Sequence, residues 1–560
     1  MAQDDENKGV KVNTKDPDSE IDSTPRASQG IAWLAGAIGA GLSLAVGEVG
    51  DRASTALTSL VVGVGNLFVD LTPGDVIATS INTVGSAQKP ILLTGITVGS
   101  ILIGGWIGVV GRKRPAAVAI GFLAFGILGA IATARDPLTN GFGSVVFSLF
   151  AALVGGAVTL LLLQLAASDA QAQANNAKPA KPGSELTLPT GRRRLLAFGG
   201  AAAGAAALGI VGRVGRTSAA QQARDAILTD SGAPAATGVN GIPLPAGPFD
   251  DINGITRRIT SINPTDDFYL IDTALSKPQV DPVTWSLTID GPFVDNPISF
   301  TYDELLAREQ IEREVTLSCV SNPVGGQLVG NALWTGIPIT ELLDEAGVQD
   351  PTNPEHQFFS TSVDGFTCGF RLPLAYDGRT AMLALMMNGE PLPINHGFPA
   401  RLVIAGLYGY VSATKWIERI EITDFVGVDG FWQPRGWAKE GPVKTQSRID
   451  VPQSRAQLTA GPTPIAGIAF SPSIGIERVE VSIGEVAELT GDEIWEEAEL
   501  ADVDTDETWR QWRYEWNAPP GDHLIRVRAT DVTGFTQSPI PVNPAPDGAE
   551  GFHTVIVRVT

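Results

Sequence analysis

The chain has 560 residues, with 39 Lys and Arg against 61 Asp and Glu, which gives a formal net charge of −22. So long a chain exceeds a single hydrophobic core, and roughly two to four domains are expected. The acidic balance argues against a nucleic-acid partner, because phosphate binding needs a basic face. It fits equally a protein adapted to high salt and an ordinary acidic exported domain.

The N-terminal third is dominated by long apolar runs. Residues 1–30 are polar and lack apolar periodicity, so a disordered cytoplasmic tail is predicted there. A helix needs about 20 apolar residues to cross a bilayer. Five runs approach this length, at 31–49, 90–111, 115–134, 144–167 and 195–212. We therefore predict transmembrane helices over 31–167 and a final one at 193–212.

Basic loop residues set the expected orientation. The clusters at 112–114 and 192–194 place their loops, including a linker at 168–192, in the cytoplasm. Five spans with a cytoplasmic N-terminus result if the shorter run at 56–71 lies in the membrane interface. Six spans with an external N-terminus are the alternative. Either arrangement predicts a multi-pass protein of the cell membrane, in contact with lipid, whose chain after Arg213 is extracytoplasmic.

The segment before the last apolar run allows two interpretations. Thr190-Gly-Arg-Arg-Arg-Leu-Leu196 precedes small residues and resembles an internal twin-arginine export signal. Ordinary positive flanking of a membrane helix is the alternative. Residues 213–262 are rich in Ala, Gly, Pro and Asp without clear periodicity, and they predict a linker.

The chain from 263 to 440 mixes strand and helix patterns, which predicts an α+β domain. Expected strands lie at 285–290, 314–317 and 357–363, expected short helices at 301–309 and 340–346, and a further apolar segment at 381–387. Helix patterns end after Gly441. Alternating apolar and polar residues at 479–483, 512–516, 524–529 and 555–559, separated by Pro and Gly turns, predict an immunoglobulin-like β-sandwich at 441–560.

One of the two cysteines lies where a strand meets a glycine-rich loop. Cys319 stands in Leu317-Ser-Cys-Val-Ser-Asn-Pro-Val-Gly-Gly326. A thiolate suits a soft or high-valent transition metal, and neighbouring glycines let a bulky cofactor approach. Taken alone, such a cysteine is more often a buried structural thiol, the interpretation we give to Cys368. Two cysteines cannot make a disulfide framework.

Three further motifs accompany this cysteine. They are Gly-Asn-Ala-Leu-Trp-Thr-Gly at 330–336, Leu392-Pro-Ile-Asn-His-Gly-Phe-Pro-Ala-Arg401, and Thr414-Lys-Trp416. Together with the Cys319 loop they resemble the sulfite oxidase family of molybdopterin-dependent oxidoreductases, over about residues 267–560. The resemblance implies that 263–440 is a sulfite-oxidase-type molybdopterin domain with Mo-molybdopterin as cofactor. It also implies that Cys319 is the catalytic, metal-binding thiolate and that the chain catalyses two-electron oxygen-atom transfer.

The resemblance also assigns the residues that would hold the cofactor. A polar pterin with a phosphate needs many hydrogen bonds and at least one cation. The positions that match the family's cofactor-binding residues are Tyr269, Thr361, His396, Arg401, Thr414 and Lys415. Taken one at a time, Arg401 is more often a surface ion pair and His396 a satisfied core histidine.

The expected substrate is a small anion such as sulfite, or a sulfoxide of the methionine sulfoxide type. Sulfite oxidases carry an arginine after the aromatic pair near the domain start, whereas Leu270 follows Phe268 and Tyr269 here. Pro323 and Val324 likewise replace basic residues. A sulfite dianion would lose charge-assisted hydrogen bonds worth about 1.5–3 kcal/mol each. Arg435 and Lys439 are the cations expected to compensate.

Electrons must come from, or go to, another molecule. No histidine precedes His356 and no Cys-x-x-Cys-His motif occurs, so the membrane region cannot ligate a bis-histidine haem of its own. A separate cytochrome, another electron carrier or a quinone is expected. A cofactor loaded in the cytoplasm requires export of a folded protein, which favours the twin-arginine interpretation of the segment at 190–196.

Two points remain: the oligomeric state that the resemblance implies, and the hypothesis that competes with an enzymatic function. In the family the C-terminal module is the dimerisation domain, so the resemblance implies a homodimer; by itself the module is equally a spacer. The competing hypothesis is a non-enzymatic envelope binding protein that has lost its cofactor. The retained Cys319, His396, Arg401 and Lys415 argue against that loss.

Overall fold

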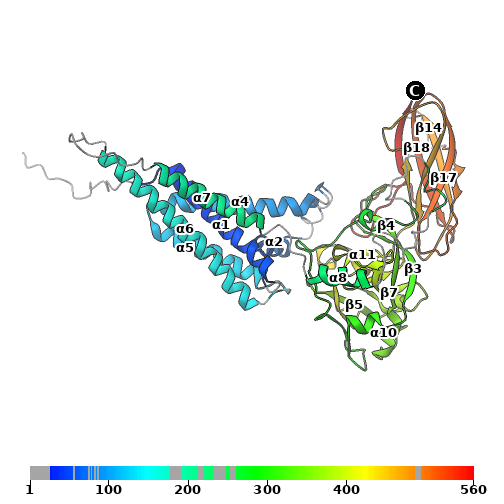
Figure 1. Cartoon of the computed structure of the whole chain (residues 1–560). Helices are drawn as coiled ribbons and strands as arrows, with labels where there is room; N and C mark the ends of the chain where they lie inside the picture. The colour runs from blue at the N-terminus through cyan, green and yellow to red at the C-terminus, as the bar shows by residue number, and fades with distance from the viewer. Residues whose placement is uncertain are drawn as a thin grey trace, which may run out of the picture. The chain divides into compact units, whose positions relative to one another are not determined.

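The structure is a computed structural model of the whole chain (Figure 1). It describes residues 26–54, 57–73, 76, 79–80, 83–84, 87–137, 139, 141–176, 191–211, 219–230, 247–252, 260–485 and 493–560. The predicted disordered tail therefore falls almost wholly outside the described residues. The chain forms two compact units, Met1–Gly50 with Gly95–Ile131 and Val145–Arg213, and Asp51–Thr94 with Ala132–Ser144 and Val214–Thr560.

The N-terminal region is helical, as its apolar runs predict. The helices are α1 (Gln29–Ala53), α2 (Leu60–Leu71), α4 (Gln88–Gly111), α5 (Pro115–Thr133), α6 (Gly141–Asn176) and α7 (Gly191–Val211). Among the described residues, four helical stretches are long and apolar enough to cross a membrane: Gln29–Ala53, Gln88–Gly111, Pro115–Thr133 and Gly141–Ser168. The apolar parts of α2 and α7 are shorter, at Leu60–Leu71 and Ala197–Leu208. The fifth span and the orientation stay predictions.

Glycines let helices of the first unit approach closely. A Cβ added at Gly36 of α1 would collide with the backbone of Gly104 and Gly108 of α4, so no larger residue fits there. Small residues at such crossings allow helix backbones to pack tightly in a membrane, where no hydrophobic force drives helices together.

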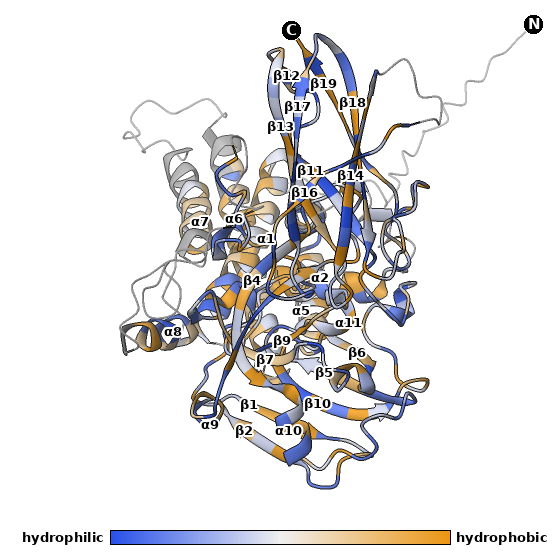
Figure 2. Ribbon diagram, turned by 90° about the vertical axis from the view of Figure 1, so that its right-hand side faces the viewer, coloured by the Kyte–Doolittle hydropathy of each residue, from blue (hydrophilic) through white to orange (hydrophobic). Residues whose placement is uncertain are grey.

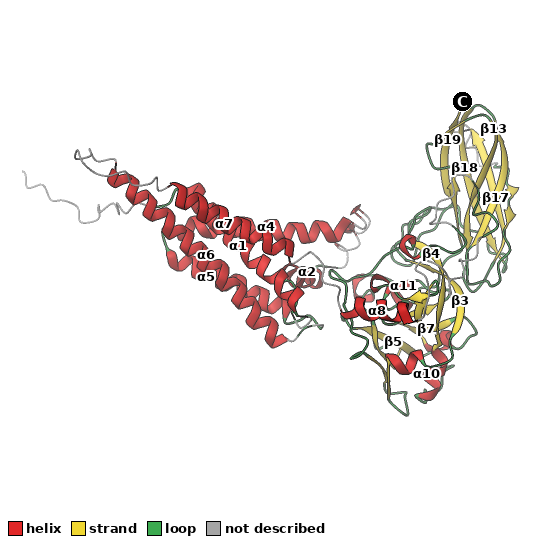
Figure 3. Cartoon of the chain, in the orientation of Figure 1, coloured by secondary structure: helices red, strands yellow, loops and turns green. Residues whose placement is uncertain are grey.

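Two sheets make the domain that follows, one mixed and one wholly antiparallel (Figure 3). One has the order β2-β1-β10-β5-β6, built from β2 (Ile298–Thr301), β1 (Ser286–Asp290), β10 (Ile417–Asp424), β5 (His356–Ser362) and β6 (Thr367–Arg371). The other has the order β3-β4-β7-β8, with β9 paired to β7: β3 (Ile311–Ser318), β4 (Val329–Pro338), β7 (Ala381–Met387), β8 (Glu390–Pro391) and β9 (Arg401–Ile404).

The expected elements of this domain appear within a few residues of their predicted bounds. α9 (Tyr302–Leu306) starts with a capping box in which Thr301 and Glu304 bond each other's backbone N–H, which satisfies two unpaired donors of the first turn. α10 (Ile339–Glu345) and β7 also match the prediction. The α+β class of the domain is therefore confirmed.

Two stretches differ from their predicted character. The glycine-rich stretch after Cys319 is a loop only to residue 328, because β4 takes over at Val329 and pairs with both β3 and β7. The predicted linker contains α8 (Ala219–Asp230), whose Ala220 is buried in the core of the domain. Arg224 of α8 pairs with Glu390 at 3.1 Å, so this helix belongs to the domain.

The C-terminal part has two sheets that share one hydrophobic core. Their orders are β11-β13-β17-β16 and β12-β19-β18-β14-β15. The strands are β11 (Gln446–Val451), β12 (Gln457–Leu458), β13 (Gly461–Phe470), β14 (Ile476–Glu485), β15 (Glu496–Glu497), β16 (Glu499–Leu500), β17 (Arg510–Ala518), β18 (Gly521–Asp531) and β19 (His553–Val559). Hydrophobic and hydrophilic residues alternate along β14 and β18 (Figure 2). That this C-terminal part is of the immunoglobulin type stays a prediction.

The β13 strand was not predicted because it contains Pro462 and Pro464. Proline cannot donate to a sheet and normally marks an edge or an interruption. In the structure both prolines pair only with β17, since β11 joins β13 from Ala466 onward. The strand therefore accommodates them where one side has no partner strand.

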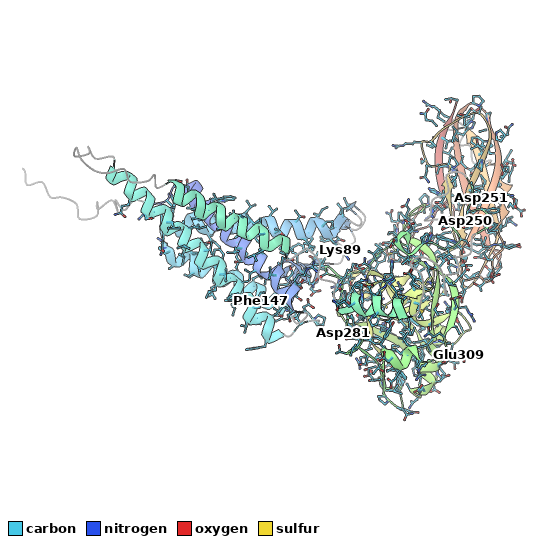
Figure 4. All side chains as sticks on the ribbon, in the orientation of Figure 1. Lys89, Phe147, Asp250, Asp251, Asp281 and Glu309 are labelled. Atoms are coloured by element: carbon cyan, nitrogen blue, oxygen red, sulfur yellow. The ribbon has the colours of Figure 1, made fainter. Side chains whose placement is uncertain are left out.

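The C-terminal domain, from β11 to β19, forms hydrogen bonds with the chain around Cys319. Thr316 of β3 donates its backbone N–H to the carbonyl of Glu507, and its hydroxyl accepts from the backbone N–H of Trp509 at 2.7 Å. Arg448 of β11 donates to the carbonyl of Gly326 at 2.6 Å. Asp250, labelled in Figure 4, accepts from Gln511 of β17 at 2.7 Å. The domain thus supports the cysteine loop from outside.

Candidate functional site

A cavity of about 760 Å³ lies against Cys319. Five of the predicted site residues line it together, although they come from distant parts of the chain: Tyr269, Cys319, His396, Arg401 and Lys415. Such a concave site with convergent polar groups is the usual form of a cofactor or substrate pocket. Thr361 and Thr414 are not among its lining residues.

Cys319 follows the last residue of β3 and is held by a closed loop. Its backbone N–H donates to Leu328 at 2.9 Å, and Asn322 Oδ1 accepts from Leu328 N at 2.9 Å. Gly325 has φ of +73°, a left-handed conformation that favours glycine, and a Cβ there would collide with His553. The loop thus fixes the cysteine at the cavity wall.

The Cys319 thiol needs a partner to ionise. Burial raises its pKa, an effect that its 3.0 Å contact with the Ser321 hydroxyl only partly opposes. A metal ion stabilises a thiolate outright. Among the described residues no group of three or more His, Cys, Asp and Glu side chains could hold a metal.

Arg401 is a buried cation aimed at the cavity. It opens β9, is 5% exposed, and its guanidinium lies 4.9 Å from the Trp334 ring. It donates to the carbonyls of His396 and Leu402 at 3.3 and 3.4 Å, and among the described residues no carboxylate lies within 4.0 Å of it. Burial lowers its pKa to about 10. A buried guanidinium without a counterion is suited to an anionic ligand such as a pterin phosphate.

His396 is neutral in this site. It lies in the 3-10 turn Ile394–His396, packed edge-on to Phe268 at 5.7 Å. Burial, reinforced by the charges of Arg401 and Lys415, lowers its pKa to about 3. A neutral imidazole can donate one hydrogen bond and accept another, as a polar pterin requires.

Lys415 shares one carboxylate with two other lysines. Its Nζ lies 2.6 Å from Asp272 and donates to the Asn395 carbonyl at 3.0 Å. Lys277 and Lys89 also pair with Asp272, Lys89 at 2.7 Å. Burial alone would raise the pKa of Asp272, but the three ammonium groups, Lys415 foremost, hold it well below its usual range.

Asp364 also lines the cavity, and its charge interacts with those of Lys277 and Lys415. Two carboxylates then face three ammonium groups and the guanidinium of Arg401, so this side of the cavity keeps a surplus of positive charge. Burial lowers the pKa of Lys415 to about 7, and the neighbouring charges of Lys277 and Arg401 act in the same direction. With Arg401, this set gives the cavity a side that fits a phosphate. Asp272 and Lys277 were not predicted; the only signal was an acidic residue three positions after Tyr269.

Thr361 and Thr414 lie behind the cavity wall. Thr414 is fully buried, with its hydroxyl 2.7 Å from that of Ser360 and 3.0 Å from the sulfur of Cys368. Thr361 lies on β5 opposite Arg419 and Thr367. Both support the segment that carries Lys415, and direct contact of their side chains with a cofactor stays a prediction. Cys368 is the buried free thiol that we expected.

Aromatic rings form another side of the cavity, which we call the aromatic wall: Phe366, Tyr410, Phe431, Trp432 and Trp437. Successive rings touch, with centroid distances of 6.0 Å for Tyr410 and Trp437, 6.1 Å for Trp437 and Trp432, and 5.2 Å for Trp432 and Phe431. Tyr410 follows Gly409, where an added Cβ would contact the Ser318 carbonyl at 3.8 Å and the Tyr269 hydroxyl at 4.0 Å. The wall was not predicted, because its members come from three separate segments.

Arg435 and Lys439 are the two cations expected to compensate for the missing arginine near Tyr269. Arg435 donates to the Phe431 carbonyl at 2.7 Å and its guanidinium lies 3.7 Å from the Phe431 ring. Lys439 bonds the Val428 carbonyl and Asp429 at 2.7 and 2.8 Å. Arg435 also pairs with Asp70 at 3.6 Å, and neither cation is among the residues that line the cavity. Binding of the substrate anion by these two residues stays a prediction that this geometry does not favour.

We expect Arg401→Met to lower the cofactor content of purified protein at least about tenfold, because a buried guanidinium provides charge-assisted hydrogen bonds that methionine cannot. The thermal stability of the cofactor-free protein should not fall, because the change removes an unpaired buried charge. Arg419→Met is the matched control, since Arg419 pairs with Asp290 at 2.9 Å and is 43% exposed. Equal cofactor content in both variants would contradict this role.

Comparisons with known proteins agree with this chemistry. A family model for an oxidoreductase molybdopterin binding domain matches residues 274–432, which include Cys319, His396, Arg401 and Lys415. Human mitochondrial sulfite oxidase is 27% identical over 334 residues, covering 52% of this chain and 59% of that protein. The uncharacterized oxidoreductase YuiH of Bacillus subtilis is 30% identical over 180 residues, covering 32% of this chain and 85% of that protein.

A solved structure also matches. The sulfane dehydrogenase SoxCD from Paracoccus pantotrophus shares 22% identity with a TM-score of 0.45, over 54% of this chain and 84% of that one. The chain spans 59% of the length of the human relative.

Proposed function

Because the chain belongs to the sulfite oxidase family of molybdopterin-dependent oxidoreductases, we propose that it is a membrane-anchored enzyme that transfers an oxygen atom with two electrons. It is a molybdenum oxidoreductase whose cofactor is Mo-molybdopterin. The observation that carries the proposal is the meeting of Cys319, His396, Arg401 and Lys415 at one cavity.

The residues of the cavity fit the cofactor in separate roles. When bound, Mo-molybdopterin supplies two-electron chemistry and oxygen-atom exchange. Cys319 would be the protein's thiolate ligand to the metal. Arg401 and Lys415 would bind the anionic phosphate, and neutral His396 would hydrogen-bond the pterin. Tyr269 lines the same space, and burial raises its pKa, so its hydroxyl stays protonated and can donate a hydrogen bond.

Membrane anchoring is supported by the four long apolar helices. The basic clusters at 112–114 and 192–194 support a cytoplasmic position for their loops, hence an extracytoplasmic catalytic domain. We propose export in the folded state through the signal-like segment at 190–196 and electron exchange with a separate carrier or quinone. The helices then anchor the enzyme without carrying a haem.

Two directions of turnover fit the site. Sulfite oxidation is the activity that the name of the human relative states. Reduction of a sulfoxide is the second candidate, favoured by Leu270 at the position where an arginine was expected and by the turned-away Arg435 and Lys439. A neutral sulfoxide needs no cation beside Cys319.

Assays in both directions test the proposal on full-length protein purified in detergent from a host that makes the cofactor. Either sulfite-dependent reduction of an electron acceptor or sulfoxide-dependent oxidation of a reduced dye is expected. Enzyme that contains molybdenum yet shows neither reaction would contradict the proposal. A folded protein that binds partners but never acquires pterin would instead support the envelope binding-protein hypothesis.

A further inference from the structure

The cavity has two sides of opposite chemistry. The charged side carries Asp272, Lys277, His396, Arg401 and Lys415, and the other is the aromatic wall. Among the described lining residues, the ammonium and guanidinium groups are those of Lys89, Lys277, Arg401 and Lys415. Three of these four pair with Asp272, and all would lie toward the phosphate of the bound cofactor.

The aromatic wall offers no charge to an anion. Tyr410 turns its hydroxyl away, donating to the Ala438 carbonyl at 2.8 Å. The guanidinium of Arg435 bonds the Phe431 carbonyl, lies over that ring and pairs with Asp70 at 3.6 Å, and Arg435 does not line the cavity. A substrate anion beside this wall would lose its hydration without gaining a counterion, which is unfavourable. The wall therefore disfavours a dianion such as sulfite.

The same wall is well suited to a flat apolar group. Phe431 and Trp432 are partly exposed, whereas Trp437 and Tyr410 are each 7% exposed and anchored by their neighbours. Adjacent rings meet at angles of 50° for Tyr410 and Trp437, 78° for Trp432 and Trp437, and 81° for Phe431 and Trp432, so the wall presents both ring faces and ring edges. Aromatic rings pack favourably on such surfaces in stacked or edge-on geometry.

We propose that the substrate is an uncharged sulfoxide with an aryl substituent, whose ring lies on the aromatic wall while its S–O group faces Cys319. The proposal rests on the oxygen-atom-transfer function above and names its substrate class. The Ser321 hydroxyl, 3.0 Å from the Cys319 sulfur, is placed to bond the sulfoxide oxygen.

The net reaction is Ar–S(=O)–CH3 + 2 e− + 2 H+ → Ar–S–CH3 + H2O. The S–O bond breaks, sulfur regains its electron pair, and the oxygen leaves as water with two protons from solvent. Two equivalents of a one-electron donor, reduced methyl viologen in the assay, supply the electrons.

The test compares substrates on the molybdenum-loaded, full-length enzyme. Methyl phenyl sulfoxide and dimethyl sulfoxide share the reacting group and differ in the ring, so the ratio of their kcat/KM values reports the ring's contact. We expect a ratio of at least about ten, mostly through KM. Sulfite should be oxidised, if at all, with a far lower kcat/KM.

Substitutions in the aromatic wall test whether the preference for the aryl sulfoxide depends on the wall. Trp437→Leu and Trp432→Leu should each lower the ratio about fivefold or more, because each removes part of the surface on which the aryl ring would pack. Trp437→Phe should restore most of the ratio. Trp495→Leu is the matched control, because Trp495 packs on Phe552 outside the cavity and should leave the ratio unchanged.

The outcomes separate this inference from the function on which it rests. A ratio near one, or a ratio that both tryptophan variants leave intact, overturns the aryl sulfoxide substrate while sulfoxide reduction stands. Sulfite as the best substrate overturns it while oxygen-atom transfer stands. Loaded enzyme inactive with every sulfoxide and with sulfite overturns both.

Discussion

Replacing Cys319 by serine is expected to lower turnover of the molybdenum-loaded enzyme by at least about a thousandfold. Even residues that only orient a metal ligand cost about 10–100-fold when mutated, and Cys319 is the proposed ligand itself. Pterin should remain bound, because in the proposal Arg401, His396 and Lys415 bind other parts of the cofactor. Dye-linked turnover and the molybdenum and pterin content of the same sample measure both effects.

Cys368→Ser is the matched control for this substitution. Cys368 is fully buried, bonded to Thr414 and Ser360, and absent from the cavity lining. Its replacement should leave turnover within about threefold of the original, because its contacts are those of a structural thiol. If Cys319→Ser kept both metal and turnover, the thiolate role would be refuted.

Asp272→Asn is expected to destabilise the cofactor-free protein by about 3 kcal/mol at pH 6. The change leaves Lys415, 8% exposed, without its carboxylate, and breaking a buried pair on one side is costly. Thermal unfolding in detergent, on protein from a host unable to make molybdopterin, gives the difference. Asp290→Asn, which breaks the more exposed pair with Arg419, should cost less than about 1 kcal/mol.

The loss of stability caused by Asp272→Asn should become smaller as the pH rises. The pKa of Lys415 in the folded protein, about 7, lies below its ordinary value of 10.5, so the cost of its buried charge is fully present below pH 7. Between about pH 7 and pH 10.5, Lys415 is protonated in the unfolded chain and neutral in the folded chain. The free energy of unfolding therefore rises with pH in this range. Without Asp272 the pKa falls further, so by about pH 9 the lysine is neutral and costs less. A deficit independent of pH between 6 and 9 would contradict the shared-carboxylate interpretation.

Local patterns in the sequence predicted much of the site. Cys319 was expected after a strand and before glycines, and it follows β3 and enters a loop with left-handed Gly325. The turn with His396 and the strand start at Arg401 lie together because their motif is short and continuous. Residues a few positions apart in a fixed motif lie close together because the chain between them is short. The motif was therefore sufficient to predict that His396 and Arg401 belong to one site.

The parts that escaped prediction depend on contacts between distant segments. Asp272 meets Lys415 across 143 positions, and the aromatic wall combines residues from Phe366 to Trp437. No local periodicity reports such pairings. The orientation of Arg435 was equally hidden, because only the fold shows that the guanidinium lies over the Phe431 ring.

Prediction from the sequence is also limited in the membrane region. Hydropathy predicted each helix, yet the helix lengths support four spanning stretches, while α2 and the apolar part of α7 are shorter. Length is decisive here because about 20 residues are needed to cross the bilayer. The proposed role of α7 in export concerns the domain that follows it, and no property of the helix itself determines that role.

The measurement that tests the central claim most directly is the molybdenum and pterin content of the full-length protein purified from membranes of a cofactor-competent host. The account predicts close to one molybdenum and one pterin per chain, with Arg401→Met strongly depleted in both. A folded preparation from that host that contains neither molybdenum nor pterin would contradict it.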